Sequence, residues 1–327
     1  MDADTAMQRA MALAAGVRAT TSPNPWVGCV VVTADGDVFE GATQPPGGPH
    51  AEVVALRAAG ERARRATLYV TLEPCCHHGR TPPCTDAIVE ADIARVVVAI
   101  EDIDPNVGGK GIARLREAGI AVEVGVQREA VEAQLAPYLK HRRTGRPWVV
   151  LKLAATLDGR TAAPDGSSRW ITGEEARVDA HRLRAESDAV LVGAGTVKAD
   201  DPELTVRHVP VDRQPRRVVL GSAPPGARVH PALELRGDLG DVLDELGRRD
   251  VLQVLVEGGA TVAGAFHRAG LVDRYIVYLA PVLFGGDDAT PLFTGPGAAT
   301  MADVWRGRIE SVTQLGDDLK VVLCSQG

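Results

Sequence analysis

The 327-residue sequence predicts two successive α/β domains. The first observation is that short runs rich in valine and isoleucine, typical of buried strands, alternate with segments typical of helices. The second is a polar, basic segment at residues 141–147, where we place a domain boundary. The third is that the same alternation starts again after this segment. We therefore expect one domain over residues 1–145 and another over residues 146–327.

The first domain is expected to begin with an amphipathic helix over residues 5–19, because apolar side chains recur there on one side. Residues 28–32 form a β-branched run, which indicates a buried strand. The Asp35-Gly36 pair then predicts a turn into a second, paired strand. The expected strands cover residues 28–32, 38–42, 67–72, 95–100 and 121–126, and the expected helices cover residues 5–19, 50–59, 84–91, 112–118 and 129–139.

The sequence of the second domain says less about function than that of the first. Residues 156–160 are typical of a hairpin corner, and residues 200–207 of a turn with clustered charge. Residues 255–261 pass from a strand into a helix over two glycines, which is a natural place for a phosphate. The expected strands cover residues 148–153, 189–192, 217–220, 252–256, 275–279 and 319–323, and the expected helices cover residues 174–185, 240–248 and 262–269.

The composition argues against several kinds of partner. Lys and Arg number 36 against 43 Asp and Glu, a net charge of −7, which does not favour a nucleic-acid binder. The apolar runs are too short to span a bilayer, and acidic residues stand where a signal peptide would be basic. Clustered cysteines fit metal binding in a reducing cytoplasm. The sequence is compatible with a homo-oligomer.

A metal site is predicted by His50, Cys75 and Cys84. Thiolate and imidazole are ligands that zinc prefers, and three protein ligands leave a fourth position for water. If His50 begins a helix, Cys75 ends a strand and Cys84 begins another helix, all three can converge on one point. Glu52 lies two residues after His50, in the pattern of zinc deaminases, where the glutamate moves protons instead of binding the metal.

Other interpretations of this cluster remain open from the residues alone. Cys76, His77 and His78 are rival ligands, and Cys76 in particular could replace Cys75. We favour Cys75 because it follows a proline, as the deaminase pattern requires. A structural zinc site is the alternative class of function, but it would have no need of the glutamate. The loop over residues 77–81, which includes Arg80, is polar and cation-bearing and suits an anionic substrate.

The run TLEPCCHHGRTPPC at residues 71–84, with Pro23-Asn24-Pro25 and Val27-Gly28 upstream, resembles the bifunctional deaminase/reductase family of riboflavin biosynthesis, called RibD. The long spacing between its ligand cysteines separates this family from cytidine, guanine and tRNA adenosine deaminases. The resemblance implies a cytidine-deaminase-like three-layer α/β/α domain, followed by a dihydrofolate-reductase-like α/β domain. It implies Zn²⁺ and NADPH as cofactors.

The resemblance also implies two consecutive reactions. The first is hydrolytic deamination of 2,5-diamino-6-(5-phosphoribosylamino)pyrimidin-4-one, in which Glu52 takes a proton from water and protonates the leaving ammonia. The second is reduction of the ribosyl group to ribityl by NADPH, which gives 5-amino-6-(5-phosphoribitylamino)uracil. The alternative hypothesis is a monofunctional nucleobase or tRNA deaminase with a C-terminal recognition domain.

The family implies further site residues, matched segment by segment. Asp200 is our candidate for proton handling in the reduction, with Lys152 as the alternative, and the arginines suit the substrate phosphate. The implied substrate-binding residues are Asn24, Ser168, Arg184, Leu204, Arg207 and Glu257, and the implied cofactor-binding residues are Ala154, Trp170, Thr196, Asp200, Ser222, Gly259, Ala260 and Thr261.

Overall fold

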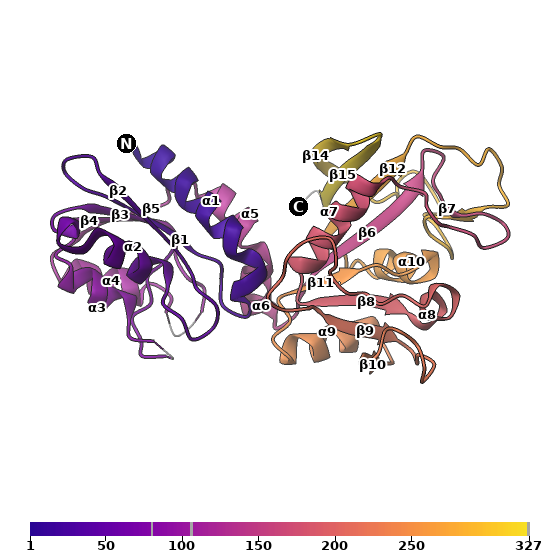
Figure 1. The fold of residues 1–327 in the computed structure, drawn as a ribbon, viewed down its shortest axis with the longest axis horizontal. Helices are drawn as coiled ribbons and strands as arrows, with labels where there is room; N and C mark the ends of the chain where they lie inside the picture. The colour runs from indigo at the N-terminus through magenta and orange to yellow at the C-terminus, as the bar shows by residue number, and fades with distance from the viewer. Residues whose placement is uncertain (80, 105–106, 326–327) are drawn as a thin grey trace. The chain divides into compact units, whose positions relative to one another are not determined.

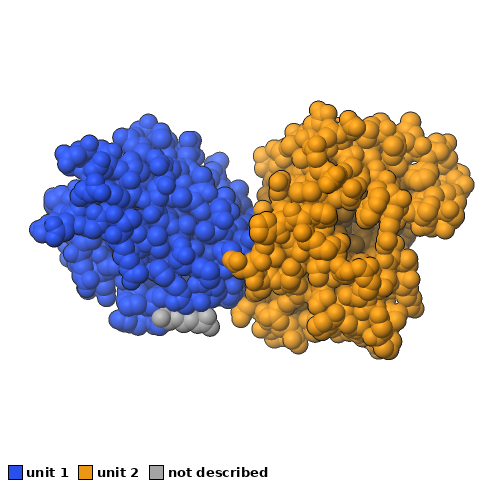
Figure 2. Space-filling view, viewed as in Figure 1, with its two compact units in different colours: residues 1–145 blue, residues 146–327 orange. Residues whose placement is uncertain are grey.

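The computed structural model describes residues 1–79, 81–104 and 107–325. The chain divides into two compact units, Met1–Gly145 and Arg146–Gly327 (Figure 2). Of the helices formed by the described residues, none is both long enough and apolar enough to cross a membrane.

The first unit is built on a mixed five-stranded sheet with the order β2-β1-β3-β4-β5. Strand β1 pairs antiparallel with β2 and β3, whereas β3, β4 and β5 run parallel. Its elements are α1 (Ala3–Thr21), β1 (Gly28–Val32), β2 (Val38–Ala42), α2 (Ala51–Ala59), a 3₁₀ turn (Gly60–Ala63), β3 (Thr67–Leu72), α3 (Cys84–Glu90), β4 (Arg95–Ile100), α4 (Lys110–Glu117), β5 (Ala121–Val124), α5 (Arg128–Gln134) and α6 (Ala136–Thr144).

Helices cover both faces of this sheet, which makes three layers. Helices α1 and α5 lie on one face and α2, α3 and α4 on the other (Figure 1). The layers approach closely where the chain carries glycine. A Cβ atom at Gly41 would lie 2.1 Å from the carbonyl oxygen of Ala51, so strand β2 holds the first turn of α2 directly against the sheet. This contact matters because residues of the candidate metal site lie at that turn.

The second unit is built on an eight-stranded sheet with the order β10-β9-β8-β11-β6-β12-β15-β14. The first six of these strands run parallel, and β15 and β14 are antiparallel additions. Its elements are β6 (Trp148–Thr156), β7 (Arg160–Ala162), α7 (Glu174–Ala185), β8 (Ala189–Gly193), α8 (Ala194–Asp200), β9 (Arg216–Leu220), β10 (Leu233–Leu235), α9 (Leu239–Arg248), β11 (Gln253–Val256), α10 (Ala260–Arg268), β12 (Arg274–Ala280), β13 (Thr290–Pro291), β14 (Gly307–Leu315) and β15 (Asp318–Ser325).

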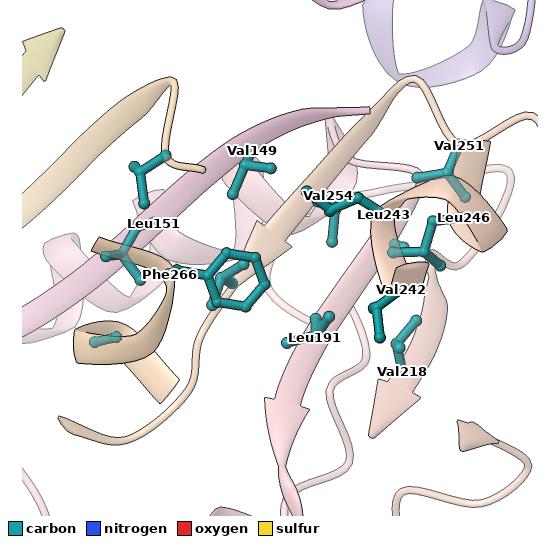
Figure 3. Packing of buried hydrophobic residues seen from close by; sticks show 14 of the residues in the cluster. Val149, Leu151, Leu191, Val218, Val242, Leu243, Leu246, Val251, Val254 and Phe266 are labelled. Carbon is teal, nitrogen blue, oxygen red and sulfur yellow. The ribbon is translucent and has the colours of Figure 1, made fainter. Parts of the chain in front are cut away.

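The core of this unit follows the two-residue period of its central strands. Val149 and Leu151 of β6 point into a cluster with α9 and α10, which contribute Leu246 and Phe266 (Figure 3). Val150, between them in sequence, belongs to a second cluster on the opposite face, with residues of α7 and α8. Both faces are therefore buried, which explains why these strands are almost uniformly apolar.

Most expected elements are present, and the differences include the following. Residues 141–144 are not linker but the last turn of α6, which ends at Gly145 with φ of 72°. Residues 194–200, for which no helix was predicted, form α8. The turn at residues 156–160 does lead into a strand, but β7 pairs with β13 and not with β6. Strand β14 was also missed, because nearly all its residues are exposed and carry no burial pattern.

Candidate active sites

The three predicted metal ligands of the first unit lie together at the ends of three elements. His50 is the N-cap residue of α2, Cys75 follows β3 closely, and Cys84 is the first residue of α3. The His50 Nδ1 atom lies 3.2 Å from Cys84 Sγ and 3.5 Å from Cys75 Sγ. The ligand atoms of the group all lie within 4.8 Å of one another. Two helix starts and one strand end therefore converge on one point, as the spacing required.

The electrostatics of this cluster suit a metal. The hydrogen bond from Cys84 lowers the pKa of the Cys75 thiol, and a hydrogen bond with His50 adds to this effect against the cost of burial. The same coupling, with burial, raises the pKa of Cys84. The lowered pKa favours the thiolate form of Cys75, and the thiolate is the form that binds metal.

The donor set fits zinc and not a hard cation, because it consists of two sulfurs and one imidazole nitrogen. Among the described residues, the group close enough to share a metal contains Cys75 and excludes Cys76. Burial and the nearby Glu73 carboxylate raise the pKa of Cys76, so its thiol is less ready to ionise. His77 and His78 are likewise outside the group, and Arg80 lies outside the described residues.

Glu52 is a buried carboxyl group beside these ligands, with only 3% of its surface exposed. Burial raises its pKa to about 7, and the charge of Cys75 acts in the same direction. Glu52 lines a cavity of about 270 Å³ together with Asn24, His50 and Cys75. The structure therefore places a proton-accepting group, two of the three predicted metal ligands and the predicted substrate residue around one small cavity.

Glu73 supports this cavity without being part of the predicted site. Its buried carboxylate accepts backbone N–H groups of Asp102 at 3.1 Å, Gly109 at 2.9 Å and Ile112 at 3.1 Å. The first two bonds go to Oε2 and the third to Oε1. The start of α4 is also pressed against the segment that carries Cys75, because a Cβ at Gly111 would lie 2.0 Å from the Pro74 carbonyl oxygen. Glu73 thus ties the ligand segment to the loop that lines the cavity.

We expect Glu73→Gln to weaken this connection by about 2 kcal/mol. The glutamine oxygen can take the place of Oε2 and keep two bonds, but its NH₂ group then faces the Ile112 N–H, which loses its acceptor. The measurement is hydrogen exchange at residues 102–104 and 107–112, which should accelerate. Glu90→Gln, an exposed glutamate in α3, is the matched control. Unchanged exchange in Glu73→Gln would show that Glu73 does not hold the loop.

Sequence reasoning missed the far wall of the cavity, which includes Asp102, Tyr138 and Arg142. The Tyr138 hydroxyl donates to both carboxylate oxygens of Asp102, at 3.0 and 3.1 Å. The Arg142 guanidinium lies 5.2 Å from the centre of the Tyr138 ring, one helical turn further along α6. The spacing of four residues between Tyr138 and Arg142 places both side chains on one face of a helix, but it indicates this only once residue 142 is known to be helical.

The second unit contains a large cleft of about 1210 Å³ at the carboxyl ends of its parallel strands. Open α/β sheets bind ligands at this edge. The cleft collects all but one of the residues predicted for this unit: Ala154, Ser168, Trp170, Arg184, Thr196, Asp200, Leu204, Arg207, Glu257, Gly259, Ala260 and Thr261. Ser222, which follows β9, is not among its lining residues; its hydroxyl accepts a hydrogen bond from Arg236, the residue after β10.

Several contacts order the part of this cleft that contains the predicted cofactor-binding residues. Thr196 in α8 accepts the Gly259 backbone N–H at 3.2 Å, which fixes the glycine turn before α10. Trp170 is 71% exposed, and the Arg177 guanidinium lies 4.8 Å from the centre of its ring. Asp200 ends α8, and its backbone oxygen accepts a hydrogen bond from Arg169 at 2.7 Å. A dinucleotide would thus meet a helix N-terminus and an exposed aromatic ring.

Arg184 and Glu257 form a buried ion pair in the same cleft. The guanidinium donates to both carboxylate oxygens at 2.6 and 2.9 Å, and to the Thr205 carbonyl oxygen at 3.0 Å. Burial opposes ionisation of Glu257, but the charge and hydrogen bonds of Arg184 outweigh it and lower the pKa to about 2. Two residues predicted separately as substrate contacts therefore hold each other.

Lys152 lies beside this pair, on β6, and its ammonium lies 5.8 Å from the centre of the Tyr278 ring. Burial lowers its pKa, the charge of Glu257 acts in the opposite direction, and that of Arg184 adds to the lowering. The cleft thus offers a lysine that gives up its proton more readily than an exposed one.

The fold and the metal cluster define a class: a zinc-dependent deaminase unit joined in one chain to a reductase unit. Residues 1–100 match the cytidine and deoxycytidylate deaminase zinc-binding region, and residues 147–321 match the RibD C-terminal domain. The riboflavin biosynthesis protein RibD of Escherichia coli is 43% identical over 96% of both chains. That of Mycobacterium tuberculosis is 44% identical, covering 99% of this chain and 97% of the other.

The chain belongs to the RibD family, and it is a bifunctional deaminase and reductase of riboflavin biosynthesis. Its fold agrees with solved structures of the family. RibD of Acinetobacter baumannii has a TM-score of 0.93 at 41% identity over 99% of both chains. A Thermotoga maritima diaminohydroxyphosphoribosylaminopyrimidine deaminase/5-amino-6-(5-phosphoribosylamino)uracil reductase has a TM-score of 0.90 at 34% identity over 98% of both chains.

The predicted cofactors and enzyme class are thereby confirmed: the cofactors are Zn²⁺ and NADPH. The alternative of a deaminase with a recognition domain is wrong, because residues 147–321 match the reductase part of the family.

Proposed function

We propose that the first unit deaminates 2,5-diamino-6-(5-phosphoribosylamino)pyrimidin-4-one and that the second reduces the product to 5-amino-6-(5-phosphoribitylamino)uracil. The observation that carries the first assignment is the position of Glu52, buried in one cavity with His50 and Cys75, which form the candidate metal group together with Cys84. A structural metal site has no use for such a carboxyl group. The name of the Thermotoga maritima relative describes the same pair of activities.

In the deaminase unit, His50, Cys75 and Cys84 would hold zinc, which supplies an activated water near neutral pH when bound. Glu52 takes a proton from the attacking water and gives a proton to the leaving ammonia. Its burial excludes bulk water from this exchange. Asn24 lines the same cavity and is placed to donate or accept hydrogen bonds with the pyrimidine ring.

In the reductase unit, NADPH supplies the hydride that goes to C1′ of the opened ribose. The helix N-terminus at Gly259, Ala260 and Thr261 would hold the cofactor diphosphate, and Trp170 would contact the cofactor. The reduction also needs a proton donor. We assign proton handling to Asp200, with Lys152 as the alternative, since burial lowers the pKa of that lysine.

Both arginines and Glu257 belong to the substrate side in this proposal, along with Ser168 and Leu204. Arg207 would contact the substrate phosphate, whereas Arg184 keeps Glu257 ionised and oriented toward the cleft. Ser222 stays a predicted cofactor-binding residue.

We also propose that the enzyme works in the cytoplasm on a small molecule, without nucleic acid or membrane, and the net charge of −7 supports the absence of nucleic acid. A homo-oligomer is compatible with this function.

The test supplies the phosphoribosylaminopyrimidine to the purified protein with and without NADPH. We expect ammonia release in both cases, and NADPH oxidation only after deamination. Cys75→Ser should weaken zinc binding by at least ~100-fold and abolish ammonia release, since a first ligand is lost. Cys76→Ser is the matched control and should keep both zinc and activity. If Cys75→Ser retained zinc and Cys76→Ser lost it, Cys76 and not Cys75 would be the zinc ligand.

A further inference from the structure

A second charged group in the reductase cleft is built from two arginines and one carboxylate. Glu203 accepts hydrogen bonds from Arg207 through Oε2 and from Arg228 through Oε1. All three side chains line the cleft. Arg228 comes from the chain after β9, 25 residues beyond Glu203, so the fold, and not local sequence, brings it here.

The backbone around this group is fixed by several independent contacts. The Arg228 N–H donates to Asp201 Oδ1 at 2.8 Å, which joins the two segments a second time. Asp201 and Leu204 have φ values of 41° and 55°, in the left-handed region that non-glycine residues rarely adopt. The side chain of Leu204 is buried in the core, and Arg184 holds the Thr205 carbonyl oxygen. Glu203 is thereby turned toward the cleft.

Stability does not explain this arrangement. The side chains of Glu203, Arg207 and Arg228 are 30%, 49% and 58% exposed. Ion pairs as exposed as these contribute little to folding, and left-handed residues cost stability. Strained backbone that persists around exposed charges is typical of a functional site.

The charge of the group suits an anion. Two guanidinium groups share one carboxylate, and hydrogen bonds from Arg228 and Arg207 lower the pKa of Glu203, so the group carries one net positive charge. Arg184, by contrast, is neutralised by Glu257 alone. Guanidinium groups present parallel N–H donors that match the oxygens of a phosphate.

We propose that Glu203 holds Arg207 and Arg228 as a clamp for a phosphate monoester. The inference rests on the proposed function and adds Arg228 as a binding residue and Glu203 as a positioning residue. Two ligands of the reductase carry such a group: the substrate, on its ribose, and NADPH, at its 2′ position. The assignment of Arg207 to the substrate favours the substrate phosphate, and kinetics with each ligand tests this against the 2′-phosphate of NADPH.

The test measures KM and kcat of the reductase step for Arg228→Gln with the deaminated substrate, its dephosphorylated form, NADPH and NADH. We expect KM for one phosphorylated ligand to rise ~10–100-fold, as expected for loss of a charge-assisted hydrogen bond. If the effect disappears with the dephosphorylated substrate, the clamp binds the substrate. If it disappears with NADH, the clamp binds the 2′-phosphate. Arg216→Gln removes an exposed arginine at the other end of β9 and should change neither KM.

Glu203→Gln tests whether Glu203 positions the two arginines or only repels the phosphate by its negative charge. If Glu203 positions the arginines, KM for the same ligand rises, although a negative charge has been removed. A fall in KM would show that Glu203 only competes with the ligand and would overturn its positioning role. Unchanged KM values in Arg228→Gln, in a parent protein that oxidises NADPH with the deaminated substrate, overturn the clamp alone. A parent protein that fails to do so overturns the proposed function instead.

Discussion

Glu52→Gln is expected to lower the rate of ammonia release by at least ~10³-fold while the protein still reduces pre-deaminated substrate. The substitution keeps the size of the side chain and its place in the cavity, but it removes the group that takes and gives protons. The measurement is the initial rate of ammonia release, with NADPH oxidation on the deaminated substrate recorded in parallel.

The fold should survive this change, because a carboxyl group that is only 3% exposed costs free energy when it ionises, and a neutral amide avoids that cost. Zinc content should also stay the same, since Glu52 is not one of the predicted ligands. The matched control is Glu61→Gln, an exposed glutamate just after α2. Ammonia release that persists in Glu52→Gln with zinc bound would show that another group moves the protons.

The clustering of the candidate metal ligands could be predicted from sequence because the place of each ligand within its own element is a local feature. Each ligand lies at the start of a helix or the end of a strand, and such ends can be located from proline, cysteine and the apolar pattern. The cavity wall opposite them could not be predicted. Tyr138 lay within the predicted helix over residues 129–139, but Arg142 reaches the cavity from the basic segment that we expected to be a linker, because a basic run is polar in either state. In a helix, the same basic residues stabilise its last turn against the dipole.

The reductase site shows a different limit. Helix α8 has seven residues and follows directly on β8, so it has too few turns to show a helical period. The pairing of Arg184 with Glu257 depends on the parallel neighbours β8 and β11, which bring positions 73 residues apart into contact. The family resemblance predicts a substrate-binding role for both residues, but only the fold shows that one neutralises the other.

Arg184→Met is expected to destabilise the second unit by about 3 kcal/mol. The side chains of Arg184 and Glu257 are 14% and 9% exposed, so removing the arginine leaves a carboxylate buried without its partner. Lys152 is close enough to compensate in part, which keeps the loss near the lower end of the usual range for buried pairs. The measurement is calorimetric unfolding, in which the midpoint of this unit should fall by about 6–12 °C.

Two variants and a pH series make this expectation specific. Arg182→Met, an exposed arginine on the same helix, should change stability by less than about 0.5 kcal/mol. Arg184→Met with Glu257→Met should recover much of the loss, since no buried charge remains.

In the parent, the depressed pKa of Glu257 contributes stability that is complete above its ordinary value of 4.5 and is lost as pH falls toward about 2. In Arg184→Met the pKa of Glu257 lies higher than in the parent, so protonation on mild acidification should relieve the buried charge and narrow the stability gap to the parent. A gap that stays constant with pH would show that the loss comes from packing and not from the uncompensated carboxylate.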